Sequence, residues 1–179
     1  MASRRDLFNS FTKPLRSNQE EDTPLLIRPP YGKDESIFQS ECPSCEDKAC
    51  VASCDEEIIF IAKDGTPTLN FDKNGCTFCD DCAKACSKDV LSLENTNTAE
   101  SLSAIFRISL DGCVAHHGVI CYSCKEPCID DAILFNGMFN PIIDEDRCTG
   151  CGFCVARCPV EAIEYRVIEL KEQKDESTK

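Results

Sequence analysis

The stretch Cys148-Thr-Gly-Cys151-Gly-Phe-Cys154-Val-Ala-Arg-Cys158-Pro159 has the C-x2-C-x2-C-x3-C-P spacing typical of cubane iron–sulfur sites. Three closely spaced thiolates can wrap around one cluster, and we expect the fourth cysteine on a following helix that points toward a second cluster. Gly150 and Gly152 flank Cys151, where the backbone must curl tightly and aim amide hydrogens at sulfur. The spacing therefore predicts clusters in pairs.

The 179-residue chain contains sixteen cysteines, which fall into four groups of four. The group that starts at Cys76 repeats the regular spacing without the proline. In the first group the middle gap is four residues, and in the third group the first gap is seven. The four groups are Cys42, Cys45, Cys50 and Cys54; Cys76, Cys79, Cys82 and Cys86; Cys113, Cys121, Cys124 and Cys128; and Cys148, Cys151, Cys154 and Cys158. We expect these sixteen cysteines to ligate up to four [4Fe-4S] clusters.

The groups recur at a fixed spacing, because 71 residues separate Cys42 from Cys113 and 72 separate Cys86 from Cys158. A fixed period indicates a duplicated unit. If the fourth cysteine of each group crosses to the neighbouring cluster, four ligand sets result, which we call sites one to four. They are Cys42, Cys45, Cys50 and Cys86; Cys76, Cys79, Cys82 and Cys54; Cys113, Cys121, Cys124 and Cys158; and Cys148, Cys151, Cys154 and Cys128.

The predicted fold is α+β, with tandem duplicated bacterial two-[4Fe-4S] ferredoxin-like modules behind a flexible N-terminal arm. The modules span residues 36–94 and 102–168, and a polar linker over 95–101 joins them. The arm covers residues 1–35, and the charged tail over 169–179 is expected to be disordered. Strands are predicted near residues 58–61, 68–71, 90–93, 104–108, 132–135, 141–143 and 162–167.

Cysteine-rich chains also use disulfides or zinc. Disulfides need an oxidising compartment and normally a cleavable signal with an apolar core, which the N-terminus lacks. Paired C-x2-C knuckles are zinc ligands, but a third cysteine two residues beyond each knuckle has no place in a tetrahedral zinc ribbon. His116 and His117 could replace Cys113 as cluster ligands, although loop histidines facing solvent are the simpler interpretation because four cysteines are already present.

The N-terminal segment offers a partner-binding hypothesis. Ser3-Arg4-Arg5-Asp6-Leu7-Phe8 resembles the start of a twin-arginine export signal, but no apolar region follows it. Instead, apolar residues fall near helical spacing before Pro14. A short partner-binding helix and an arm with incidental apolar residues both remain open. The candidate partner-binding residues are Arg4, Arg5, Leu7, Phe8 and Phe11.

Composition excludes several classes of function. The 19 basic and 32 acidic residues give a formal net charge of −13, so nucleic acid is not an expected partner. No apolar stretch approaches the roughly 20 residues that a membrane-spanning helix needs. The chain shows no nucleophile–base pair, phosphate loop or substrate pocket motif, so we do not expect an enzyme.

Several features together resemble the NapF-type ferredoxins of periplasmic nitrate reductase operons. They are the start Ala2-Ser3-Arg4-Arg5, the segment Ile27-Arg28-Pro29-Pro30 before Asp34-Glu35-Ser36, and the four cysteine groups in this order with the C-x7-C third group. The resemblance covers nearly all of residues 1–168, although the gap between Cys45 and Cys50 departs from the x2 spacing expected there.

The resemblance implies a cytoplasmic iron–sulfur accessory protein. Its partner would be the molybdenum-containing catalytic subunit of periplasmic nitrate reductase, contacted as a cytoplasmic precursor and helped to mature before export. A redox donor is the other candidate partner. The alternative function is that of an electron-carrier polyferredoxin that wires a membrane-associated oxidoreductase.

The composition also predicts that the chain depends on its clusters for folding. Tryptophan is absent and the apolar core of each module is small, so metal binding must supply folding free energy. A sample stripped of iron should lose its cooperative unfolding transition when followed by circular dichroism. A native-like transition in that sample would contradict this expectation.

Overall fold

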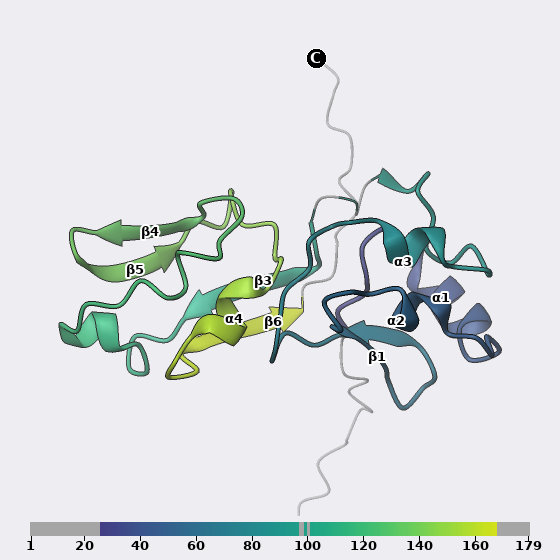
Figure 1. The fold of residues 1–179 in the computed structure, drawn as a ribbon, viewed down its shortest axis with the longest axis horizontal. Coiled ribbons are helices and arrows are strands. Elements are labelled where there is room, and N and C mark those ends of the chain that lie inside the picture. Colours follow the sequence, from purple (N-terminus) through teal and green to yellow (C-terminus); the bar gives the residue numbers. More distant parts are fainter. Residues whose placement is uncertain (1–25, 97–98, 100, 168–179) are drawn as a thin grey trace, which may run out of the picture.

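The computed structural model describes residues 26–96, 99 and 101–167, and all elements are short. Figure 1 shows an elongated body, with α1, α2, α3 and β1 at one end and β3 to β6 with α4 at the other. The elements are α1 (Glu35–Glu41), α2 (Ala49–Ala52), β1 (Ile59–Ile61), β2 (Pro67–Leu69), α3 (Asp81–Lys84), β3 (Ala104–Ile108), the 3-10 helix η2 (Val114–His117), β4 (Ile133–Asn136), β5 (Phe139–Ile143), α4 (Phe153–Arg157) and β6 (Ile163–Val167). This is a small mixed α/β fold.

The described strands form three antiparallel pairs. β1 pairs with β2 and β4 pairs with β5 as hairpins, whereas β3 pairs with β6 across the second half, from Ala104 opposite Val167 to Ile108 opposite Ile163. In the first half an antiparallel bridge joins Gly32 to Leu91, so the chain entering that half meets the chain leaving it. Six of the predicted strands are found within a few residues, while the segment near 90–93 contributes this bridge alone.

The fourth cysteine of a group does not lie on the helix, contrary to expectation. Helix α4 ends at Arg157, and Cys158 after it has an extended backbone with φ −76° and ψ 113°. Cys54 and Cys86 likewise follow α2 and α3. The x3 spacing allows about one helical turn after the third cysteine, and the chain then leaves the helix so that the fourth thiol faces the neighbouring site.

A left-handed acidic turn follows each fourth cysteine, and sequence reasoning missed it. Three residues beyond Cys54, Cys86, Cys128 and Cys158, an acidic residue has φ between +51° and +54°. Its amide donates a hydrogen bond to the carbonyl oxygen of that cysteine, over 3.0 to 3.4 Å. The four residues are Glu57, Asp89, Asp131 and Glu161. The recurring C-x2-[DE] spacing was the available signal, but two of the four residues are glutamates, whereas left-handed backbone favours glycine, asparagine and aspartate.

The packed body begins before residue 36, which corrects the predicted end of the arm. Ile27 is 3% exposed and its carbonyl oxygen accepts a hydrogen bond from the Leu69 amide at 2.9 Å. Arg28 binds the Glu35 carboxylate and lies 4.8 Å from the centre of the Phe38 ring. These contacts hold residues 27–35 against the first half. The candidate arm residues Arg4, Arg5, Leu7, Phe8 and Phe11 and the predicted tail lie outside the described residues.

The two halves share one apolar core. Phe71 from the first half lies against Phe106 and Tyr165 from the second, with ring centres 5.5 and 5.4 Å apart. Phe71 and Phe106 are almost completely buried. A Cβ atom on Gly152 would collide with the Phe71 ring, so the close approach of the halves requires glycine there. The two halves are therefore held together by direct packing as well as by the linker.

The left-handed turns predict unequal effects of substitution at Glu161. Glycine adopts this backbone without strain, so Glu161→Gly should be neutral or stabilise by up to about 1 kcal/mol. A β-branched residue is strained there, so Glu161→Val should destabilise by about 1–3 kcal/mol. The measurement is the urea midpoint for loss of cluster absorbance under anaerobic conditions.

Glu164 in β6 is the matched control for that substitution, since it is exposed and lies in an ordinary strand. Glycine weakens a strand interior, so Glu164→Gly should lower the midpoint. Equal effects of glycine at residues 161 and 164 would contradict the left-handed turn.

Candidate iron–sulfur centres

Three cavities are each lined by the four cysteines of one predicted ligand set. The three cavities are similar in size. The remaining lining is mostly apolar, with residues such as Ile61 at the first cavity and Ile133 at the second. The cysteines are Cys42, Cys45, Cys50 and Cys86 at the first cavity; Cys128, Cys148, Cys151 and Cys154 at the second; and Cys113, Cys121, Cys124 and Cys158 at the third. Sites one, four and three thus each bring together cysteines from two groups.

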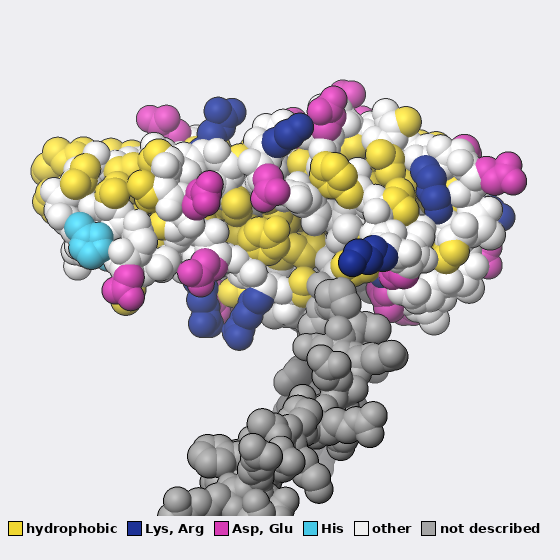
Figure 2. Space-filling view, turned by 90° about the horizontal axis from the view of Figure 1, so that it is seen from below, with side chains coloured by type: hydrophobic (Ala, Val, Ile, Leu, Met, Phe, Trp, Pro, Cys, Tyr) yellow, Lys and Arg dark blue, Asp and Glu magenta, His cyan; other side chains and the backbone are white. Residues whose placement is uncertain are grey.

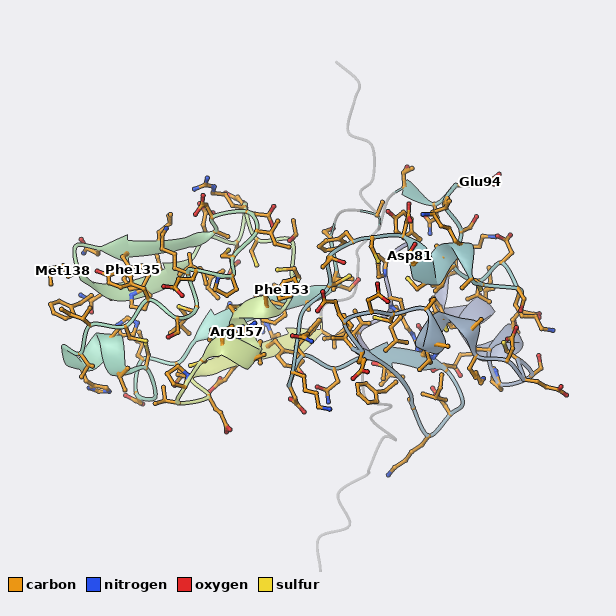
Figure 3. The ribbon with its side chains drawn as sticks, in the orientation of Figure 1. Asp81, Glu94, Phe135, Met138, Phe153 and Arg157 are labelled. Atoms are coloured by element: carbon orange, nitrogen blue, oxygen red, sulfur yellow. The ribbon has the colours of Figure 1, made fainter. Side chains whose placement is uncertain are left out.

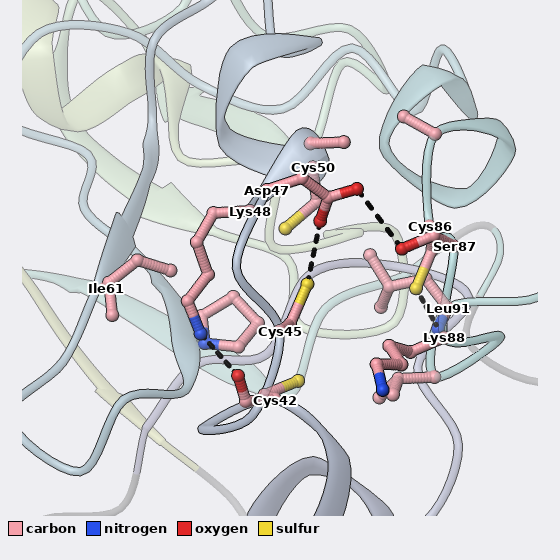
Figure 4. Close-up of a pocket in the computed structure, with 14 residues that line it drawn as sticks. Cys42, Cys45, Asp47, Lys48, Cys50, Ile61, Cys86, Ser87, Lys88 and Leu91 are labelled. Carbon is pink, nitrogen blue, oxygen red and sulfur yellow. Dashed lines mark hydrogen bonds between the residues drawn. The ribbon is translucent and has the colours of Figure 1, made fainter.

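Site one has charged residues at its rim (Figure 4). The Cys45 thiol donates a hydrogen bond to Asp47 Oδ1 at 2.9 Å, and Ser87 Oγ donates to Asp47 Oδ2 at 3.2 Å. Lys48 Nζ donates to the carbonyl oxygens of Cys42 and Gly65. Both charged residues come from the widened gap between Cys45 and Cys50. The unusual spacing therefore adds an anion and a cation to site one without moving its cysteines away from the cavity.

At site two, burial and neighbouring thiols raise the pKa of Cys76 and of Cys82. Burial raises the pKa of Cys76 to about 12, and the neighbouring Cys54 and Cys79 add to the rise. Burial likewise raises the pKa of Cys82 to about 12, with further contributions from Cys76, Cys79 and Cys54. Cys54 thus lies close enough to Cys76 and Cys82 to raise the pKa of both, as Cys151 does for Cys76 and Cys50 does for Cys82.

Backbone amides point at the cysteine sulfurs. Gly150 and Gly152 have φ of +73° and +84°, which confirms the tight curl expected around Cys151. The same two positions of the second group are Phe78 and Asp80, at +56° and +64°. Amides aimed at sulfur stabilise a buried anionic cluster and tune its potential. Amide hydrogen bonds reach Cys76 from Phe78 at 3.4 Å, Cys86 from Leu91 at 3.5 Å, Cys128 from Ala132 at 3.3 Å and Cys158 from Ala162 at 3.2 Å.

Burial keeps the thiols protonated when no cluster is bound. Burial raises the pKa of Cys50 and of Cys124 to about 11, and it also raises the pKa of Cys154. Iron binds the thiolate, so assembly of a cluster must release these protons. The affinity of the sites for iron therefore increases with pH.

The arrangement of donors suits a cluster better than a single ion. Among the described residues, no group of three or more His, Cys, Asp or Glu side chains is placed to hold one metal ion. A zinc site needs four donors about 2.0–2.3 Å from one point. Four thiols around an apolar cavity, with amides directed at sulfur, fit the larger [4Fe-4S] group, which supplies one-electron storage when bound.

The two histidines lie outside the lining of site three. His116 Nε2 donates to the Pro141 carbonyl oxygen at 3.2 Å, and His117 Nε2 donates to the Asp111 carbonyl oxygen at 3.0 Å. Cys113, for which they were alternatives, is buried and lines the cavity. The structure therefore favours the cysteine at this position.

Comparisons with known proteins agree with this chemistry. Residues 141–164 match the Fer4 family, a 4Fe-4S binding domain. The ferredoxin-type protein NapF of Escherichia coli K12 is 37% identical over 141 residues, which cover 76% of this chain and 82% of that protein. The NapF of Haemophilus influenzae is 32% identical and covers 88% of each chain. The ferredoxin-type protein NapG of E. coli K12 is 29% identical over 85% of this chain and 74% of its own. No helix of the described residues is long and apolar enough to span a membrane.

The crossover sets make a non-additive prediction for site one. Cys42 and Cys86 belong to different groups but line the same cavity. Removing either should remove one cluster, and removing both should remove no more, because the two side chains serve one site. With four cubanes the parent chain binds about sixteen irons, and Cys42→Ala, Cys86→Ala and the double variant should each bind about twelve.

Iron and labile sulfide are measured on anaerobically reconstituted protein. Pairing Cys42→Ala with Cys79→Ala is the matched control, since it should remove two clusters and leave about eight irons. A similar fall in the Cys42→Ala and Cys86→Ala double variant would indicate ligation within groups.

Proposed function

Because this chain belongs to the NapF family of ferredoxin-type proteins, we propose that it is a cytoplasmic accessory protein that carries four [4Fe-4S] clusters. In this proposal it contacts the cytoplasmic precursor of the molybdenum-containing catalytic subunit of periplasmic nitrate reductase and helps that subunit mature before export. The two halves act as duplicated two-cluster modules, and all sixteen cysteines ligate iron.

The observation that carries the proposal is the crossed set of cysteines at each cavity. Cys86 completes site one and Cys158 completes site three, while Cys128 completes site four. Such crossing links two clusters in each half. The recurrence of the acidic left-handed turn after each fourth cysteine supports the same duplicated unit.

A protein partner is supported by the distribution of apolar side chains. Exposed apolar residues gather at the outer end of the second half, where Figure 2 shows them beside a histidine. Met138, which Figure 3 places at this end, is 52% exposed, and Val119 and Ile120, which follow η2, are 53% and 60% exposed. Contiguous exposed apolar surface often marks a site of protein interaction. We assign recognition of the partner to this end together with the arm residues Arg4, Arg5, Leu7, Phe8 and Phe11.

The clusters would serve maturation by supplying electrons or by donating iron–sulfur units. Site one is the best candidate for donation, because the Asp47 carboxylate close to Cys45 would repel the thiolate that a bound cluster requires. The alternative function is an electron-carrier polyferredoxin for a membrane-associated oxidoreductase. The chain is also 27% identical, over 88% of its length, to the methylamine utilization ferredoxin-type protein MauM, so similarity to ferredoxin-type proteins extends beyond NapF and NapG.

Capture of the catalytic-subunit precursor separates the two functions. Tagged full-length chain should retain the precursor from anaerobic cytoplasmic extract, and removal of residues 1–20 should reduce recovery at least about tenfold, equivalent to about 1.4 kcal/mol of binding. Recovery is measured by immunoblot against the precursor, with iron content checked for each form.

The control is the full-length chain in which lysine replaces Arg4 and Arg5. This change keeps the positive charge but removes the guanidinium groups, so it separates the effect of charge from that of guanidinium geometry. A full-length chain that contains its clusters, undergoes turnover-linked reduction and yet recovers no precursor would contradict the accessory role and support the carrier.

A further inference from the structure

The two sites within each half are joined by short segments that serve both of them. Cys50 of site one lies in α2, and Cys54 of site two follows two residues after that helix ends. Cys82 of site two lies in α3, and Cys86 of site one follows it. In the second half, Cys154 in α4 and the following Cys158 join sites four and three in the same way. Each half thus links its own two sites through covalent chain.

The link between halves involves sites two and four. The Cys76 amide donates a hydrogen bond to the Cys151 carbonyl oxygen at 2.7 Å. Cys76 belongs to site two and Cys151 to site four, so only the bonds of two ligand residues and one hydrogen bond separate their sulfurs. Figure 3 shows Phe153, two residues after Cys151, between the two halves.

Glycine is required at this contact. A Cβ atom on Gly75 would lie 2.5 Å from the Phe153 backbone nitrogen and 2.6 Å from the Cys151 carbonyl oxygen, far inside contact distance. Neither of these is the flexible end of a side chain, so the two loops would have to move apart. Gly75 therefore allows the loops that carry sites two and four to touch.

Sites one and three lie at opposite ends of the body. The lining of site one comes from residues 42–91, and the lining of site three comes from residues 108–163. Site one is next to α2 and α3, and site three is next to η2 and β5, at the two ends of the view in Figure 1.

We propose that the four sites form a single electron path in the spatial order one, two, four, three, and that the Cys76–Cys151 contact is its junction. The order differs from the order of the groups along the chain. Electrons that enter at either end cross between the halves at this contact, where one hydrogen bond joins a ligand residue of site two to a ligand residue of site four. The proposal rests on the [4Fe-4S] occupancy of the proposed function, and Gly75 acts in it as a positioning residue.

Magnetic coupling between reduced clusters tests the order. Dithionite supplies one electron to each cluster and is oxidised to sulfite. The full chain with Cys42→Ala and Cys113→Ala retains sites two and four, and its reduced EPR spectrum should show split or broadened lines from spin–spin interaction. The full chain with Cys79→Ala and Cys148→Ala retains sites one and three, and its spectrum should show two non-interacting signals.

The junction is tested in the chain that keeps all sixteen cysteines. Gly75→Ala should slow the redistribution of one electron between the halves after a flash of photoreduced flavin, and should weaken the coupling between sites two and four. Gly112→Ala is the matched control, because its Cβ would meet ordinary contacts of 3.4 Å and longer. It should leave both measurements unchanged.

Iron content separates the possible failures. Parent protein without cubane iron would overturn the proposed function itself. Full iron content with coupling between sites one and three, or with no coupling between sites two and four, would overturn the order. A Gly75→Ala protein with full iron content and unchanged electron redistribution would overturn the junction.

Discussion

Burying anionic metal clusters in a small protein is the constraint on which this structure depends. Each oxidised cubane with four thiolates carries a charge of about −2, in a chain whose formal charge is already −13. A buried charge is tolerated only where dipoles offset it. The backbone therefore turns through left-handed conformations at Gly150, Gly152 and their counterparts Phe78 and Asp80, and directs amides inward. Because the chain makes these turns so often, its strands and helices are short.

The same constraint explains why the halves do not form separate cores. Seven of the buried core side chains among the described residues are cysteines, which reduces the apolar volume available to each half. Phe71, Phe106 and Tyr165 supply the missing volume where the halves meet. That packing also brings Gly75 against Phe153 and places the two inner sites next to each other. The same aromatic packing therefore stabilises the fold and places the two inner sites close together.

The grouping of cysteines around three cavities and the positions of most strands were predictable, because spacing and alternation are local properties. Cys86 could be placed beside Cys42 from spacing alone, and β3 was found at the predicted residues. The packing of residues 27–35 was missed, because it depends on long-range contacts of Ile27 and Arg28. The contact between Cys76 and Cys151 was also out of reach, since no periodic pattern connects two loops in different halves. Glu57 and Glu161 in left-handed turns run against ordinary propensity, so propensity could not reveal that the turn recurs at all four places.

The position of Phe71 has a consequence for synthesis of the chain on the ribosome. Proteins emerge from the N-terminus, and domains generally fold in that order. Here the first half emerges with Phe71 uncovered, because the residues that bury it, Phe106, Gly152 and Tyr165, are made later. The first half is therefore left with an open apolar face until nearly the whole chain has been translated. Insertion of clusters into the first half during translation would not shorten that period, because the residues that cover Phe71 all belong to the second half.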